Sequence, residues 1–161
     1  MLRIVQLQPD IAVAPQVAEA DFADIAARGF RSVVNIRPDG EAADQLPNAQ
    51  AEDAARRSGL VFRHLPVMSF NVTDDDVVED FARLMDDLPK PILFYCGSAN
   101  RCTALWTQTA AQRIGIDEAL AVARKTGQDF DFLREALEER AGWHDTARAQ
   151  AAAAATQSAA G

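Results

Sequence analysis

Short continuous runs of hydrophobic residues recur along the chain and predict its strands. Each run is mainly apolar or β-branched and lies next to turn residues, a pattern typical of strands. Five such runs are present, at 2–7, 11–14, 32–36, 60–67 and 91–95. The last one is interrupted by no polar residue and therefore predicts a central strand of a parallel sheet.

Between and after these runs, hydrophobic residues return at helical spacing. Helices are predicted at 19–28, 48–58, 74–88, 101–113, 117–126 and 129–141. Asn48 is the expected N-cap of the second helix, and Thr73 with Asp76 resembles a capping box at the start of the third. The alternation of strand and helix predicts one α/β domain of three layers, a mainly parallel central sheet with helices on both faces.

Composition changes near residue 142. Residues 1–142 carry the periodic pattern and are enough to bury a hydrophobic core, so they form the predicted domain. In the tail, 143–161, the residues from 147 onward are mostly alanine with a few polar residues and have no amphipathic stripe. We expect this tail to be flexible or loosely helical.

The charge balance bears on the partners that the domain can take. The net charge is −8 and the pI about 4.7, which argues against nucleic acid because a phosphate backbone demands a basic face. A small anionic substrate stays compatible, since a local pocket can be positive on an acidic protein. No apolar stretch approaches the roughly 20 residues that cross a membrane, so no membrane partner is expected. Nothing in the sequence determines the oligomeric state.

Cysteine usage and the N-terminus suggest a compartment. The chain has two cysteines, Cys96 and Cys102, too few for a disulfide framework but suited to a reducing environment. The N-terminal residues are too short and too polar a stretch for a signal peptide. We therefore expect a cytoplasmic protein. The histidines and cysteines lack zinc-site spacing, so neither a metal nor a cofactor is expected.

The segment after the last predicted strand carries the strongest chemical signal. Cys96 ends the strand, Gly97, Ser98, Ala99 and Asn100 form a short loop, and Arg101 opens the next helix. Backbone N–H groups of such a loop and the helix N-terminus form an anion site that favours a thiolate. Arg101 adds a planar, charged fork that binds two oxygens of an oxyanion. The pattern predicts a nucleophilic Cys96 and an oxyanion held by Arg101 and the loop amides.

Three further residues have both a chemical and a structural interpretation. Arg37 and Asp39 follow a predicted strand and should lie at the same carboxyl edge of the sheet as Cys96. Arg37 is either a second positive charge for the ligand or part of a salt bridge, and Asp39 is either a general acid or a turn residue. Cys102 either packs in the core or acts as a resolving thiol for Cys96.

The chain resembles the phosphatase-like domain of beta-lactamase hydrolase-like proteins, a family assigned as phosphatases or sulfur transferases. The resemblance covers nearly all of 3–140 and rests on three segments, Leu7–Gln16, Val34–Glu41 and Tyr95–Trp106. It implies a fold similar to that of dual-specificity protein phosphatases. The family's loop tends to carry arginine directly after the cysteine and glycine at the fourth position, where this chain has Gly97 and Ala99.

Two activities follow from this resemblance. Cysteine phosphatases place five residues between cysteine and arginine, whereas this chain has four, a spacing similar to that of single-domain rhodaneses. The aspartate that dual-specificity phosphatases use as general acid is missing, because Met68 and Ser69 follow Val67. On mechanism, these two features favour a rhodanese-like sulfurtransferase that forms a Cys96 persulfide, which is the alternative. Because the resemblance covers nearly the whole chain and not the loop alone, it implies first a cysteine-dependent phosphatase-like hydrolase. A non-catalytic anion-binding domain is the third hypothesis.

Overall fold

A five-stranded sheet forms the centre of the domain. The computed structural model describes residues 1–160, and for 143–145, 147–148 and 157–160 it describes the backbone only. The strands are β1 (Val5–Gln8), β2 (Ile11–Ala14), β3 (Ser32–Asn35), β4 (Val61–His64) and β5 (Ile92–Tyr95). Their order is β1-β2-β5-β3-β4, in which β1 is antiparallel to β2 and all other neighbours are parallel. The predicted mainly parallel sheet is confirmed.

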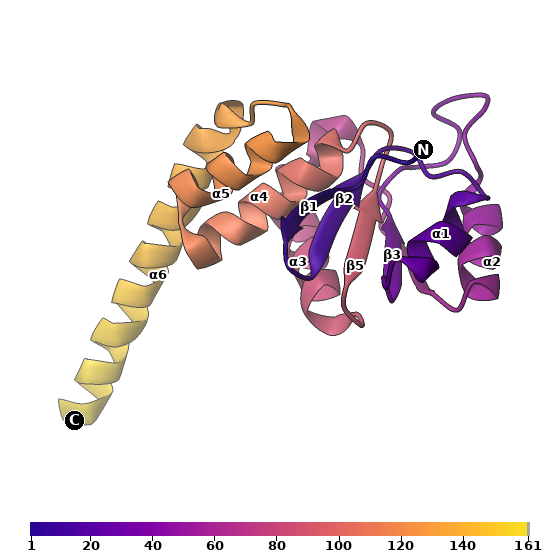
Figure 1. Cartoon of the computed structure of the whole chain (residues 1–161). Coiled ribbons are helices and arrows are strands. Elements are labelled where there is room, and N and C mark those ends of the chain that lie inside the picture. Colours follow the sequence, from indigo (N-terminus) through magenta and orange to yellow (C-terminus); the bar gives the residue numbers. More distant parts are fainter. Residues whose placement is uncertain (161) are drawn as a thin grey trace.

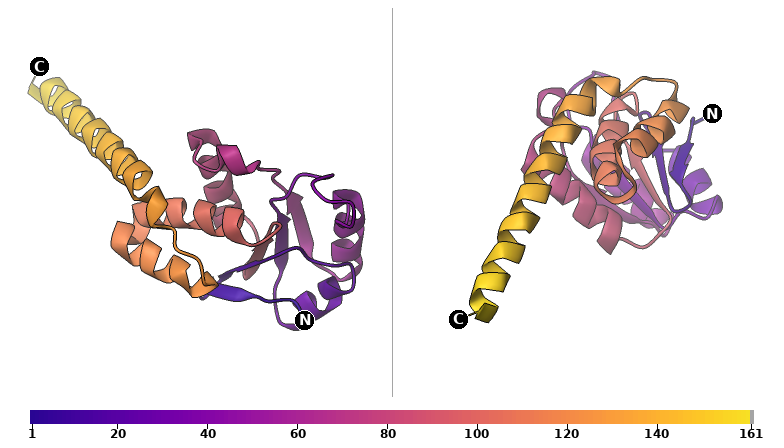
Figure 2. Two further views of the ribbon diagram at one scale, coloured as in Figure 1. Left: turned by 90° about the horizontal axis from the view of Figure 1, so that it is seen from above. Right: turned by 90° about the vertical axis from the view of Figure 1, so that its left-hand side faces the viewer.

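Helices cover both faces of this sheet (Figure 1). One face carries α1 (Asp21–Ala27) and α2 (Asn48–Arg57), and the other carries α3 (Asp75–Asp87) and α4 (Asn100–Ile114). Outside α4 lie α5 (Ile116–Ala123) and α6 (Arg134–Ala160), as both views in Figure 2 show. Short 3-10 turns, η1 (Ser69–Asn71), η2 (Arg124–Thr126) and η3 (Asp131–Leu133), complete the connections. The expected three-layer α/β architecture is confirmed.

The central strand β5 sets the position of the cysteine loop. Its four residues have no exposed surface, and alternate side chains enter opposite cores. Ile92 and Phe94 pack toward α3 and α4, where the Phe94 ring lies 4.3 Å from that of Phe81. Cys96 continues this alternation into the same core. Because β2, β5 and β3 run parallel, the segments that follow them meet at one edge of the sheet.

Both predicted helix caps are wrong. Pro47 is the N-cap of α2, and the Asn48 side chain is not free to cap because its Oδ1 accepts a hydrogen bond from Asn35 Nδ2 at 3.1 Å. Asp39 serves this helix end instead, since its Oδ1 accepts the Asn48 backbone N–H at 2.8 Å. Asp74 is the N-cap of α3 and makes no side-chain capping bond.

The last helix extends the domain well beyond the sheet. Residues on both sides of position 142 belong to α6, whose C-terminal part projects away from the body (Figure 1). None of the helices in the part of the chain that the structure describes is long and apolar enough to span a membrane.

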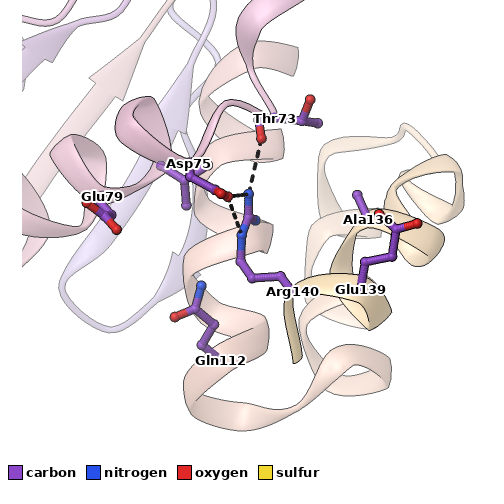
Figure 3. A pocket seen from close by; sticks show the side chains of 8 residues that line it. Thr73, Asp75, Glu79, Gln112, Ala136, Glu139 and Arg140 are labelled. Atoms are coloured by element: carbon purple, nitrogen blue, oxygen red, sulfur yellow. Dashed lines mark hydrogen bonds and ion pairs between the residues drawn. The ribbon is translucent and has the colours of Figure 1, made fainter. Parts of the chain in front are cut away.

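Arg140 attaches α6 to the body of the domain. It lies in a cleft of about 540 Å³ between α3, α4 and α6 (Figure 3). Its Nη2 donates to Asp75 Oδ1 at 2.8 Å and to the Thr73 carbonyl at 3.1 Å, and its Nη1 donates to Gln108 Oε1 at 3.0 Å. The Arg140 side chain is only 11% exposed, so these bonds are shielded from solvent on one side.

Replacing Arg140 with alanine is therefore expected to lower the free energy of unfolding by about 2 kcal/mol, since several charge-assisted hydrogen bonds are lost together. Urea denaturation measures this change. Arg134→Ala is the matched control on the same helix, because Arg134 is 41% exposed and its partner Asp117 is 90% exposed. That variant should leave the free energy of unfolding close to the wild-type value, because exposed ion pairs contribute little. Equal effects of the two substitutions would contradict the assigned anchoring contact.

Candidate active site

The loop between β5 and α4 is fixed to the neighbouring strand segments. The Cys96 N–H donates to the Ala14 carbonyl at 3.4 Å, and the Gln16 N–H donates to the Gly97 carbonyl at 3.2 Å. Helix α4 begins at Asn100, one residue before the predicted start, and Ala99 is its N-cap with a φ of 74°. This left-handed conformation is unusual for a residue with a Cβ atom. It turns the chain sharply enough to start the helix directly over the cysteine.

Cys96 is buried and acidic. Its side chain has no exposed surface, yet its pKa is lowered from 9.0 to about 6. The first cause is a hydrogen bond from the Cys102 side chain; the backbone N–H groups of Cys102 and Ser98 and the charge of Arg101 act in the same direction. Burial opposes them, because it penalises a charged sulfur. The donors prevail, so the thiolate predominates at neutral pH.

Cys102 is the partner that makes this possible. It is completely buried, and burial together with the neighbouring Cys96 raises its pKa well above the ordinary thiol value. Cys102 therefore stays protonated, and its S–H group donates a hydrogen bond to the Cys96 thiolate. Both thiols are free, and they lie side by side as a resolving pair would need. The resolving role stays a prediction.

Arg101 reaches across the loop to the opposite side of the sheet edge. Its Nη1 and Nη2 donate to the two carboxylate oxygens of Glu41 at 2.9 and 2.7 Å, a bidentate pair. A third bond, from Nη1 to the Val67 carbonyl at 3.0 Å, fixes the guanidinium to the segment after β4. The Arg101 side chain is only 13% exposed, which leaves it little freedom to turn away from the loop.

Arg37 provides a second guanidinium at the same place. Its Nε donates to Glu41 Oε1 at 2.9 Å, and its Nη1 donates to Gln16 Oε1 at 3.0 Å. A Cβ on Gly97 would lie 3.4 Å from both Arg37 Nε and Arg101 Nη2. This is ordinary van der Waals contact, so both guanidiniums lie against the loop at Gly97. We call the group formed by Arg37, Glu41 and Arg101 the arginine clasp.

Sequence reasoning assigned no role to Glu41, although it lies in one of the segments that carry the family resemblance. Hydrogen bonds from Arg101, the first cause, and from Arg37 lower the pKa of its carboxyl group. Arg37 forms a salt bridge with Glu41 and lies against the loop, and its second role, as a positive charge for a ligand, stays a prediction. The signal that identifies Glu41 is spatial rather than sequential, because its partner Arg101 lies 60 residues further along the chain.

Asp39 and two further polar residues, His64 and Asp75, have structural partners. Asp39 is bound to the start of α2, as described above, and His64 Nε2 lies 2.9 Å from the Arg37 carbonyl oxygen, so His64 supports the clasp from behind. Asp75, in the acidic start of α3, binds Arg140 rather than any group of the loop. Among the residues searched, no group of three or more histidine, cysteine or acidic side chains is placed to hold a metal ion.

Comparison with known sequences places this geometry in a family. Residues 2–113 match the family described as "Beta-lactamase hydrolase-like protein, phosphatase-like domain". A beta-lactamase hydrolase-like protein of Xylella fastidiosa (strain 9a5c) is 32% identical over 142 residues, which cover 87% of this chain and 33% of that protein. One from Agrobacterium fabrum is 30% identical over 105 residues, 65% of this chain and 24% of that protein. The chain thus spans about a third or less of the length of these relatives.

Solved structures share the fold. A candidate phosphatase from Neisseria meningitidis has a TM-score of 0.76 and 30% identity over 84% of this chain and 96% of that one. Tk-PTP in its active form has a TM-score of 0.64 and 19% identity, over 84% and 94% of the chains. The P. aeruginosa TpbA complex with pTyr has a TM-score of 0.57 and 15% identity, over 84% and 85%. At such low identity, the last two bear on the fold alone.

The left-handed Ala99 predicts a stabilising substitution. This conformation costs an L-residue about 1–2 kcal/mol, and the greater freedom of glycine in the unfolded chain offsets about 0.4–1 kcal/mol. Ala99→Gly should therefore raise the free energy of unfolding by up to about 1.6 kcal/mol, measured by urea denaturation. Ala111→Gly, in the interior of the same helix, should lower it by about 1 kcal/mol. A destabilising effect at both positions would contradict the conformation of Ala99.

The thiolate predicts a distinctive pH dependence of alkylation. The rate at which iodoacetamide modifies Cys96 should rise with a midpoint near pH 6, because the pKa of Cys96 is about 6 rather than 9. Replacing Cys102 with alanine removes the largest cause of the lowered pKa and should move this midpoint to higher pH. At any pH below the new midpoint, the thiolate fraction falls about tenfold for each pH unit. Intact-mass measurements across pH 4.5–10 test both statements. A wild-type midpoint near 9 would contradict them.

Proposed function

Because the chain belongs to the family of phosphatase-like domains of beta-lactamase hydrolase-like proteins, we propose that it is a cysteine-dependent phosphatase-like hydrolase. Cys96 is the nucleophile, and Arg101 with the amides of Gly97, Ser98, Ala99 and Asn100 binds the oxyanion. One observation supports this most strongly, the buried Cys96 thiolate beside Arg101 at the start of α4. Arg37 adds a second positive charge on the same side of the loop.

The proposed reaction has two steps. The Cys96 sulfur attacks phosphorus, a P–S bond forms, and the P–O bond to the leaving group breaks with its electron pair on oxygen. Water then attacks phosphorus and releases phosphate and the Cys96 thiolate. Loop amides and Arg101 stabilise charge on the non-bridging oxygens in both steps. A leaving oxygen of high basicity also requires a proton donor.

The clasp carboxylate is unsuited to donate that proton. The pKa of Glu41 is lowered by its two arginines, so it is ionised at neutral pH. Asp39, the acid suggested by the sequence, is held at the start of α2, where its Oδ1 accepts the Asn48 backbone N–H. We infer that the hydrolase acts on esters whose leaving group departs without protonation. Aryl phosphates meet this condition and alkyl phosphates do not.

Sulfur transfer is the second candidate, and the same feature favours it. A thiolate attacks the outer sulfur of thiosulfate, the S–S bond breaks, and sulfite departs with the electron pair, leaving a Cys96 persulfide. This step needs an anion site and a reactive sulfur but no general acid. The loop of four residues between Cys96 and Arg101 is similar in length to that of rhodaneses and makes a smaller cradle than the five-residue phosphatase loop.

The cellular setting belongs to the proposal as well. Two free thiols suit a reducing compartment, which supports a cytoplasmic domain that acts on a small anionic substrate. We assign the folded body to residues 1–142. Since the chain corresponds to about a third of the longer relatives, the proposed activity is that of this domain.

Two measurements distinguish the activities. A hydrolase should release 4-nitrophenol from its phosphate ester and act on O-phosphoserine at least about 100-fold more slowly, since general acid catalysis contributes about 10² or more. A sulfurtransferase should gain the mass of one sulfur atom after exposure to thiosulfate. In both cases Cys96→Ser should abolish the effect, whereas Lys125→Gln, at an exposed position, should keep it.

Each outcome has a definite meaning. Turnover of the aryl ester without sulfur uptake establishes the hydrolase, and sulfur uptake without turnover establishes the sulfurtransferase. Neither effect, in a protein whose Cys96 still reacts with iodoacetamide, would refute both enzymatic hypotheses and leave the anion-binding domain.

A further inference from the structure

The carboxylate of Glu41 lies where the two guanidiniums of the site converge. It accepts three hydrogen bonds, one from Arg37 Nε and two from the terminal nitrogens of Arg101, at 2.7–2.9 Å. The Glu41 side chain is 29% exposed, and the two arginine side chains are 13% and 15% exposed. An acidic side chain thus uses the same donors that an anionic ligand would need.

A tethered carboxylate is a strong competitor for these donors. Glu41 follows Arg37 by only four residues, so its effective concentration at the clasp far exceeds that of a free monovalent ion. The charges of the two arginines, Glu41 and the Cys96 thiolate sum to zero. A second anion therefore gains little from the field of the site while Glu41 remains in place.

We propose that Glu41 is an internal ligand of the anion site, which tetrahedral oxyanions displace and which free carboxylates do not. The inference rests on the proposed function in one respect, that the two arginines and the loop form a substrate anion site. It adds a residue that determines specificity and affinity, acting before any chemical step. Glu41 selects ligands by the number of donors that they can satisfy.

The selection follows from the geometry of the oxygens. A sulfate or phosphoryl group has at least three terminal oxygens, so it can replace all three bonds of Glu41 and also meet the amides of the loop. A free monocarboxylate has only the two oxygens that Glu41 already provides. Such a ligand gains no additional bond and loses the advantage of the tether.

The segment that carries Glu41 has room to let the side chain leave. Residues 37–47 contain no helix or strand, and Gly40 has a φ of 80° in the turn directly before Glu41. A hollow of about 580 Å³ beside this turn is lined by residues of the segment itself, between 39 and 47. The displaced carboxylate therefore enters solvent rather than a packed core.

Titration with inorganic anions tests the proposal. Isothermal calorimetry with sulfate and with acetate is performed on the wild type and on Glu41→Gln. We expect the variant to bind sulfate at least tenfold more tightly, a change of about 1.4 kcal/mol, and to bind acetate measurably where the wild type does not. Glu52→Gln is the control, since Glu52 is 46% exposed in an ion pair with Arg56 and should behave as wild type.

Unchanged or weaker sulfate binding by Glu41→Gln would overturn the proposal and show that Glu41 orients the arginines instead. Absence of sulfate binding in both proteins would overturn it too. Glu41→Asp keeps the charge on a side chain one carbon shorter, and its sulfate affinity should lie between the other two, which guards against a folding defect in one variant. Because these titrations involve no turnover, their failure leaves the hydrolase and sulfurtransferase tests independent.

Discussion

The arrangement of this sheet edge depends on stabilising a negative charge on the buried Cys96 sulfur. The sulfur has no exposed surface, and burial of a charge costs several kcal/mol unless donors compensate it. The compensation comes from the loop itself, through backbone N–H groups, the Cys102 thiol and the charge of Arg101. Central strand β5 delivers the sulfur, and the left-handed turn at Ala99 aims the following helix at it. Each element has a local reason to form, and together they make a buried thiolate tolerable.

The clasp extends this logic to the surface of the site. Two arginines held close together repel one another, and the Glu41 carboxylate between them relieves the repulsion. His64, at the end of β4, contacts the backbone carbonyl of Arg37. The carbonyl of Val67, just after β4, accepts a hydrogen bond from the guanidinium of Arg101. Because β3, β4 and β5 are parallel, the segments that follow these three strands end at the same edge of the sheet and bring the groups of the clasp together. Both guanidiniums lie against the loop at Gly97.

The sequence was a good guide where a single segment carries the information. A buried apolar run followed by Cys96, small residues and Arg101 specifies strand, loop and helix locally, and all three are present. It was a poor guide where partners come from distant segments. Asn48 looked like a helix cap, but Asp39 performs that function because Asn35 already holds the Asn48 side chain. Glu41 drew no attention, since a carboxylate in a polar turn is ordinary until its partners are known.

The pairing of Cys96 with Cys102 has a consequence for substrate-trapping variants. In such a variant serine replaces the nucleophile so that a ligand stays bound without reacting. Here the negative charge of Cys96 is one reason why the pKa of Cys102 is raised, alongside burial. A serine at position 96 carries no charge at neutral pH, so the second sulfur loses part of what keeps it protonated. Burial, the first cause, stays in place, so Cys102 remains protonated and a serine trap of this domain is expected to be chemically inert.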